Sequence, residues 1–172
     1  AEAARLIKEL PPHLSKMAAF SLSTGLRQHN VSYLRWSQVD LGRALAIIPA
    51  SESKNKRPIT VPLNADAMNI LNSVLTDHEQ YCFVYNGSPV YRTSTKAWAA
   101  AKKRANIDNF RWHDLRHTWA SWHVQNGTSL QELQLLGGWK TFEMVLRYAH
   151  LSGDHLVQAA KRIETGDQLP LL

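Results

Sequence analysis

Prolines and glycines divide this chain into short segments, and the apolar spacing within almost all of them is helical. The exception is the middle of the chain, where β-branched runs at 39–49 and 59–62 flank a polar tip and predict an antiparallel hairpin or meander. A further short strand is expected at 83–85, at the sheet edge, followed by a turn at 86–87. The 172 residues suffice for one domain and scarcely for two. We therefore expect a single α+β domain, mainly helical, with a small antiparallel sheet.

Capping signals place several of the helix ends. Asn64 is typical of an N-cap, and Ser129 with Glu132 forms a capping-box pattern. We also expect Thr141 to cap a helix that carries Tyr148. The expected helices cover approximately residues 1–10, 12–24, 31–36, 64–75, 94–105, 114–124, 129–137, 141–148 and 154–163.

Composition excludes several protein classes. Apolar residues make up 44% of the chain and charged residues 20%, which is typical of a globular protein and not of a disordered one. The longest apolar runs, such as 44–49, are far shorter than the ~20 residues that cross a bilayer, and the N-terminus has no secretory signal pattern. Cys82 is the only cysteine, which excludes an intramolecular disulfide. We expect a protein without membrane contact, in the reducing cytoplasm of a host cell.

The excess of positive charge is concentrated in one stretch. The chain carries a net charge of +6, and residues 92–116 hold seven basic and two acidic side chains, a local charge of 7 − 2 = +5. Clustered positive charge is typical of a surface that binds a polyanion such as DNA, although a solvated helix face has the same composition. The candidate DNA-binding residues are Arg92, Lys96, Lys102, Lys103, Arg104 and Arg111.

The segment HDLRH brings two histidines and an arginine together at a helix start. His113 and Arg116 lie three residues apart, so they share one helical face, as an anion-binding pair with a proton acceptor would. His113 and His117 also have a spacing that binds metals, but a third ligand is missing and the Arg116 cation would repel a metal. We therefore expect no metal, and we expect His117 to be a core or capping histidine.

Four other residues are unremarkable when taken singly. Arg27 follows a glycine stop in STGLR, and Lys54 lies in the polar tip of the expected hairpin, where charged side chains are common. Taken alone, Trp139 and Tyr148 are interpreted as ordinary core aromatics. Only their order along the chain distinguishes them.

That order resembles the catalytic domain of the tyrosine recombinases, the phage integrase family. The resemblance rests on STGLR, a hairpin with a lysine, HDLRHTWAS, and LLGGW with a tyrosine nine residues after the tryptophan, and it spans about residues 10–150. It implies the tyrosine recombinase catalytic fold for the whole of 1–172, and an enzyme that breaks and rejoins DNA. The catalytic residues it implies are Arg27, Lys54, His113, Arg116, Trp139 and the nucleophile Tyr148.

The implied reaction needs no ATP, metal or other cofactor. The hydroxyl of Tyr148 attacks a DNA phosphodiester and leaves a 3′-phosphotyrosyl link with a free 5′ hydroxyl, and the 5′ hydroxyl of a second strand reverses the step. Two guanidiniums and an indole N–H suit the negative charge of the transition state. His113 is the residue best matched to accept the tyrosine proton near neutral pH, and Lys54 can protonate the leaving oxygen.

Two positions depart from the family pattern. Asn30 stands where members carry an acidic residue three positions after the first arginine, so we expect an amide to orient Arg27. Trp139 replaces the more usual histidine, and its indole donates a hydrogen bond but cannot accept a proton.

The resemblance also implies partners. These are double-stranded DNA attachment sites for integration and excision of phage DNA, accessory DNA-bending proteins, and further copies of the chain. We expect the tail, 151–172, to be exchanged between protomers in a homodimer or tetramer, with a tail folded back on its own domain as the alternative. Alternatives for the function are a type IB topoisomerase and a non-catalytic DNA-binding module.

Overall fold

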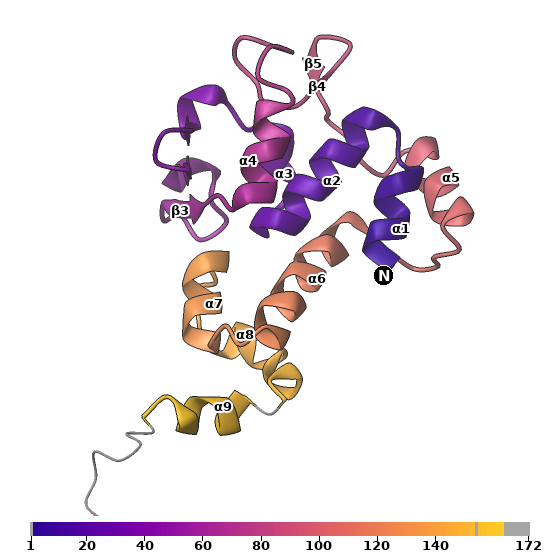
Figure 1. The fold of residues 1–172 in the computed structure, drawn as a ribbon. Helices are drawn as coiled ribbons and strands as arrows, with labels where there is room; N and C mark the ends of the chain where they lie inside the picture. Colours follow the sequence, from indigo (N-terminus) through magenta and orange to yellow (C-terminus); the bar gives the residue numbers. More distant parts are fainter. Residues whose placement is uncertain (1, 154, 164–172) are drawn as a thin grey trace, which may run out of the picture.

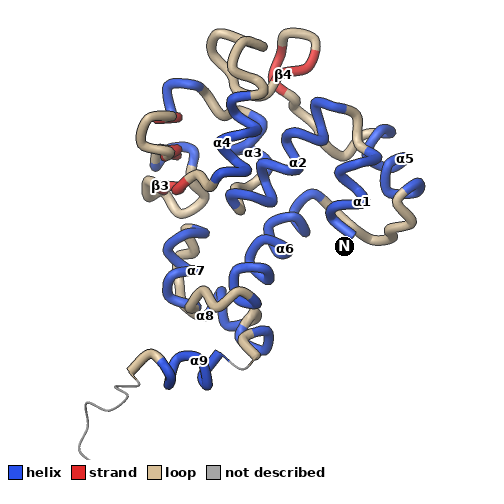
Figure 2. Tube along the Cα trace, viewed as in Figure 1, coloured by secondary structure: helices blue, strands red, loops and turns tan. Residues whose placement is uncertain are grey.

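The computed structural model describes residues 2–153 and 155–163, which form helices around two small antiparallel sheets. The α-helices are α1 (Glu2–Glu9), α2 (Pro12–Thr24), α3 (Gln28–Ser32), α4 (Ala65–Asn72), α5 (Lys96–Arg104), α6 (Trp112–Gln125), α7 (Leu130–Gly137), α8 (Glu143–Leu146) and α9 (His155–Lys161) (Figure 1). The 3-10 helices are η1 (Trp36–Gln38), η2 (Ala50–Glu52) and η3 (Ala149–Leu151). The strands are β1 (Val39–Asp40), β2 (Leu45–Ile48), β3 (Ile59–Pro62), β4 (Val84–Tyr85) and β5 (Ser88–Pro89) (Figure 2).

The β-branched runs form the expected meander. Strands β1, β2 and β3 pair in sequence order, all antiparallel, with Ile48 opposite Ile59 at the end where the polar connection leaves the sheet. The expected strand at 83–85 and the turn after it are present as β4 and the turn at 86–87, but β4 does not join this sheet, so its predicted place at the sheet edge was wrong. Asn86 and Gly87 both adopt positive φ, 51° and 78°, and this tight turn pairs β4 with β5 in a separate hairpin.

Helix α2 is the centre of the larger core and ends where α6 crosses it. It packs against α1, α3, α4 and α6. Gly25 ends the helix in a left-handed conformation, with φ of 67° and its N–H bonded to the Ser21 carbonyl. A Cβ at Gly25 would lie 2.4 Å from the Trp119 ring, so glycine also permits the close contact of α2 with α6.

The buried side chains divide into two clusters. The larger cluster surrounds α2 and includes Phe20, Leu34 and Leu71, all fully buried. The smaller cluster lies among α6, α7 and α8 and includes Leu133 and Tyr148. Figure 1 shows α6 running from the body formed by α1 to α5 to the smaller group of α7 and α8. The two clusters therefore meet along α6, which begins with the HDLRH motif.

The helix expected at 141–148 is shorter than predicted. Helix α8 begins at Glu143 without a side-chain cap, so the predicted Thr141 cap was wrong. The helix has only four residues, and Tyr148 lies beyond its end, in the turn that leads into η3. Burial in the smaller cluster, and not a continuous helix, thus holds Tyr148 in place.

The tail continues from η3 into α9, which extends away from the body (Figure 1). Residue 154 and residues 164–172 of the predicted tail lie outside the described residues. Within 2–153 and 155–163, no helix combines the length and the apolar character that a membrane span requires.

Candidate active site

One cavity of about 520 Å³ is lined by all six residues that the motifs single out as catalytic. They come from four separate parts of the chain: the turn after α2, the β2–β3 connection, α6, and the segment from α7 to η3. The cavity lining also includes Asn55, His117, Glu143, Met144 and Arg147. The fold therefore brings side chains together across more than 120 residues of sequence.

Arg116 is the most buried cation of the cavity, with 4% of its surface exposed. Its Nη1 donates to the Gly25 carbonyl and its Nη2 to the Gly137 carbonyl, each at 2.6 Å. These bonds connect the ends of α2 and α7 to α6 and fix the plane of the guanidinium. Burial lowers the pKa of Arg116 to about 9, with a further contribution from the charge of Arg27, so the side chain remains charged at pH 7.

Arg27 is half-buried and immediately precedes α3. Burial lowers its pKa, and its charge also disfavours the charged form of Arg116. Two like charges of this kind at one cavity repel each other until an anion binds between them. The pair is therefore suited to a phosphate group.

The Asn30 amide does not take the role expected of it. Instead of orienting Arg27, its Nδ2 donates to the backbone carbonyl of Glu52 at 3.0 Å. The Glu52 carboxylate is itself held by Arg35 and by Gln38. Asn30 thus fastens the start of the β2–β3 connection to α3.

Lys54 is exposed on that same connection. On its other side, Asn55 Nδ2 donates to the Gly138 carbonyl at 2.6 Å. The connection is therefore held on both sides of Lys54, by the bond from Asn30 to Glu52 and by the bond from Asn55 to Gly138. This explains how a lysine on a polar tip comes to line the cavity.

Trp139 forms the wall behind Arg116. Its ring centroid lies 4.1 Å from the guanidinium carbon, a cation–π contact, and 6.1 Å from the centroid of the Tyr148 ring. The ring also packs directly on Gly137, where an added Cβ would lie 2.0 Å from the nearest ring atom. Trp139 is therefore part of the support for the guanidinium as well as a candidate hydrogen-bond donor.

Tyr148 is 4% exposed, and its hydroxyl lies 2.5 Å from Nδ1 of His117. The prediction that His117 is a core or capping residue was wrong, because it lines the cavity and contacts the candidate nucleophile. His113 is more exposed, and its ring meets the His117 ring edge-on at 4.8 Å. The i, i+4 spacing of the two histidines was the signal for this shared face.

The protonation of these groups follows from burial. Burial lowers the pKa of His113, and the positive charge of Arg116 lowers it further. Burial also lowers the pKa of His117, and Arg147 adds to this effect. Burial raises the pKa of Tyr148, while Arg147 and Arg116 oppose the rise. At pH 7 both histidines are therefore neutral and the tyrosine carries its proton.

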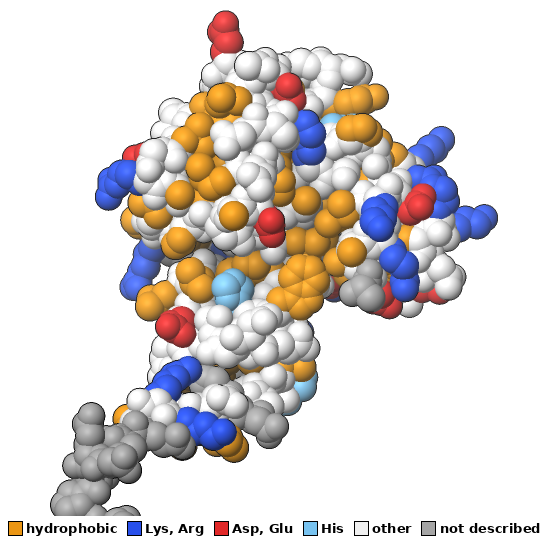
Figure 3. All heavy atoms as spheres, viewed as in Figure 1, with side chains coloured by type: hydrophobic (Ala, Val, Ile, Leu, Met, Phe, Trp, Pro, Cys, Tyr) orange, Lys and Arg blue, Asp and Glu red, His pale blue; other side chains and the backbone are white. Residues whose placement is uncertain are grey.

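The surface formed by the basic stretch is less uniformly positive than its sequence suggests. Arg104 is paired with Glu9 of α1 through Nε at 2.7 Å. At the start of α6 the Asp114 carboxylate accepts from the Arg111 backbone N–H at 2.7 Å and pairs with the Arg111 guanidinium at 3.4 Å. Figure 3 shows Lys and Arg side chains gathered around α1 and α5 with acidic side chains among them. The assignment of the six basic residues to DNA binding remains a prediction.

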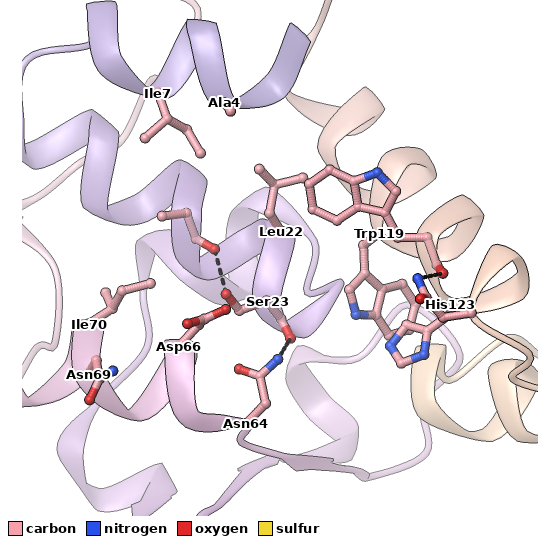
Figure 4. Close-up of a pocket in the computed structure, with 13 residues that line it drawn as sticks. Ala4, Ile7, Leu22, Ser23, Asn64, Asp66, Asn69, Ile70, Trp119 and His123 are labelled. Carbon is pink, nitrogen blue, oxygen red and sulfur yellow. Dashed lines mark hydrogen bonds between the residues drawn. The ribbon is translucent and has the colours of Figure 1, made fainter. Parts of the chain in front are cut away.

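A second, apolar cavity of about 580 Å³ lies between α1, α2, α4 and α6. Figure 4 shows Ile7, Leu22 and Trp119 around it, and its lining includes none of the six candidate catalytic residues. Elsewhere, within the described ranges, no three His, Cys, Asp or Glu side chains are grouped as metal ligands.

Comparison with known proteins identifies relatives for nearly the whole chain. The model of the phage integrase family matches residues 1–155. The integrase of Salmonella phage P22 is 44% identical over 95% of this chain and 46% of its own length. The shufflon-specific DNA recombinase of Escherichia coli is 32% identical over 84% of this chain and 37% of its own length. The chain thus spans less than half the length of these curated relatives.

Solved structures agree with the fold. The catalytic domain of bacteriophage HP1 integrase superposes with a TM-score of 0.71 and 26% identity, covering 98% of this chain and 95% of that domain. The motif pattern is also like that of an integrase from a temperate Haemophilus phage, and this likeness is confirmed, because HP1 is a Haemophilus phage. The expected fold, a mainly helical α+β domain of the tyrosine recombinase catalytic type, is likewise confirmed.

Proposed function

The chain belongs to the phage integrase family, and from this premise we propose that its arginine-, histidine- and tyrosine-lined cavity breaks and rejoins DNA strands. The proposed reaction is site-specific recombination by transesterification through a 3′-phosphotyrosyl intermediate. The observation that carries the proposal is the convergence on one cavity of the Arg27 and Arg116 guanidiniums with a lysine, two histidines and a tyrosine hydroxyl.

The two arginines would bind the non-bridging oxygens of the scissile phosphate. Arg116 is oriented in advance by two carbonyl bonds, so little reorganisation is needed when negative charge develops on those oxygens. Arg27, half-buried at the same cavity, would complete the anion site, and Trp139 would add a neutral donor. Removing one such donor typically slows the reaction about 10²–10³-fold.

The proton transfers also have candidate groups. At pH 7 the phenolate of an unperturbed tyrosine lies ~3 pK units, or about 4 kcal/mol, above the phenol, so an acceptor lowers the barrier. His113 and His117 both line the cavity. Lys54, on its fixed connection, would protonate the leaving 5′ oxygen.

For the whole protein we propose double-stranded attachment sites as the substrate, used for integration and excision of phage DNA in the cytoplasm of the host cell. The basic residues of 92–111 would track the phosphate backbone without reading sequence. Accessory DNA-bending proteins would assist the complex. The name of the P22 relative, an integrase, supports this assignment.

We also propose that the tail joins protomers in a dimer or tetramer. Leu156, Val157 and Ile163 are 79%, 54% and 82% exposed on or just after α9. An apolar segment of this kind, extending from the body, is suited to packing against another copy of the chain.

The test is covalent capture of DNA. The chain is incubated at low salt with a pool of nicked duplexes of randomised sequence, in which cleavage releases a short fragment and prevents rejoining. Denaturing electrophoresis should then show a protein–DNA adduct for the wild type and none for Tyr148→Phe. Absence of an adduct in both, with retained DNA binding, would instead support a non-catalytic DNA-binding module.

A topoisomerase of type IB would form the same adduct, so the outcome needs a second assay. Captured duplexes are sequenced, and pairs of the recovered site are supplied intact. Exchange of strands between the two duplexes is expected. Relaxation of supercoiled DNA without exchange and without sequence preference would support the topoisomerase.

A further inference from the structure

We propose that His117, and not His113, is the catalytic residue that accepts the Tyr148 hydroxyl proton during strand cleavage. This inference rests on the proposed function, because it assigns a role within that reaction. The observation behind it is the contact of His117 Nδ1 with the Tyr148 hydroxyl, at 2.5 Å. A general base must be within hydrogen-bond reach of the proton that it removes, and His117 is.

The positions of the two histidines support different duties. His113 is exposed, and it also lines a neighbouring cavity together with Arg27. It is thus placed beside a guanidinium that would hold the phosphate. His117 lies one turn further along α6, half-buried, with its ring beside both His113 and Tyr148. The fold therefore separates a phosphate-facing histidine from a tyrosine-facing one.

The chemical state of His117 suits an acceptor. Its lowered pKa keeps the imidazole neutral at pH 7, and a neutral ring with a free Nδ1 lone pair carries its hydrogen on Nε2. Several charged or titratable groups act on the charge of this ring or line the same cavity. They are His113, Asp114 and Arg116 on α6, Glu143, Arg147 and Tyr148 in the segment after α7, and Arg27 and Lys54 across the cavity.

Strand cleavage exchanges one bond to phosphorus for another. The Tyr148 oxygen forms a bond to phosphorus while its proton moves to His117 Nδ1. The bond from phosphorus to the 5′ oxygen breaks, and that oxygen takes a proton from Lys54. In rejoining, an incoming 5′ hydroxyl returns its proton to Lys54, and the departing Tyr148 oxygen recovers its proton from His117.

The test compares adduct formation by His117→Asn and His113→Asn on a nicked duplex recovered from the randomised pool. Asparagine can still accept a hydrogen bond from the tyrosine but cannot remove its proton. We expect His117→Asn to slow adduct formation about 10²–10⁴-fold, the usual contribution of a general base. In the wild type the rate should fall as the pH drops below the pKa of His117, and His117→Asn should lack that fall.

A substrate with sulfur at the bridging 5′ position separates the base from the acid. A thiolate leaves without protonation, because a thiol is a far stronger acid than an alcohol. The sulfur substrate should restore Lys54→Ala and should not restore His117→Asn. Restoration of both variants would contradict the assignment.

Chemical rescue keeps the proposal testable if an asparagine variant folds poorly. His117→Ala leaves space for a small base, so added imidazole should accelerate its adduct formation, with no such effect on His113→Ala. Thermal melting of each variant checks that it is folded. An adduct rate for His117→Asn within threefold of wild type, or imidazole rescue confined to His113→Ala, would overturn the proposal. Failure of the wild type to form any adduct would instead contradict the proposed function.

Discussion

At the scale of single residues, Arg116 has both a structural role and a place in the candidate site. The two backbone carbonyls that it binds close the ends of α2 and α7, so the same side chain stabilises the fold and presents a charge to the cavity. The Trp139 ring, 4.1 Å from the guanidinium carbon, supports that charge from behind. A lysine carries the charge without the planar fork, so it cannot reproduce both bonds.

We therefore expect Arg116→Lys to lower the rate of adduct formation about 10²–10³-fold. It should also lower the free energy of unfolding by about 1–3 kcal/mol, because buried carbonyls of Gly25 and Gly137 lose a donor. Single-turnover kinetics and urea denaturation measure the two effects. Arg5→Lys, at an exposed position of α1, is the control and should change neither. A variant with normal stability and normal rate would contradict this description of Arg116.

At the scale of elements, the β2–β3 connection is the part of the site that depends most on contacts distant in sequence. Lys54 is exposed, and its position is set by the bond of Asn30 to Glu52 before it and the bond of Asn55 to Gly138 after it. The Asn55 bond reaches Gly138, 83 residues away in the chain. Loss of that bond should free the connection without altering the charge of the cavity.

Asn55→Ala should accordingly lower the rate of adduct formation by up to about 10²-fold, the cost of misplacing a catalytic group by roughly 1 Å. The sulfur-bridged substrate, which needs no proton from Lys54, should remove most of this defect. Asn72→Ala, an exposed asparagine at the end of α4, is the matched control. If the sulfur substrate leaves the Asn55→Ala defect unchanged, the connection does not act through Lys54.

How far the sequence predicts an element depends on whether its signals are local. Asn64 caps α4, Ser129 and Glu132 form the capping box of α7, and Gly138 ends it, as expected, because each signal acts within one turn. The turn that carries Tyr148 was not predicted, since it is held by burial among α6 and α7.

The same distinction applies to the candidate site. The six residues named from the motifs all line the cavity, because the order of the motifs carries information that no single residue does. His117 was assigned to the core. The sequence predicts which face of the helix carries His117, but it does not predict which side chain packs against that face. The packing of the turn after α8 places Tyr148 against His117.

At the scale of the whole molecule, the apolar side chains of α9 lie outside both buried clusters. If the tail joins protomers, Leu156→Asp should shift the mass measured by light scattering toward the monomer. Leu135→Asp provides a matched control, because Leu135 on α7 is 78% exposed and Leu156 is 79% exposed. An equal effect of both variants, or of neither, would contradict a specific role of the tail.

Four histidines whose pKa is lowered in the folded state make the stability of the chain depend on pH. Burial lowers the pKa values of His13, His113, His117 and His123 below the value of 6.5 expected in the unfolded chain. The unfolded state then binds more protons between those pKa values and 6.5, so stability rises with pH across that window. The contribution of these histidines to stability is fully present above about pH 6.5 and is lost as the pH falls through their lowered pKa values.

Urea denaturation should therefore give a lower free energy of unfolding at pH 5.0 than at pH 7.5. His123→Gln should reduce the difference, because it removes one of the groups that take up protons on unfolding. A stability that is constant or increases toward pH 5.0 would show that these histidines are not protected by the fold.

Locating the covalent bond shows whether Tyr148 is the nucleophile of a DNA-cleaving site. The captured adduct is digested with protease and nuclease, and the modified peptide is sequenced by mass spectrometry. We expect a nucleotide joined through its 3′ phosphate to Tyr148 and a free 5′ hydroxyl on the released strand. A bond to any other side chain, or a 5′-phosphate linkage to Tyr148, would contradict it.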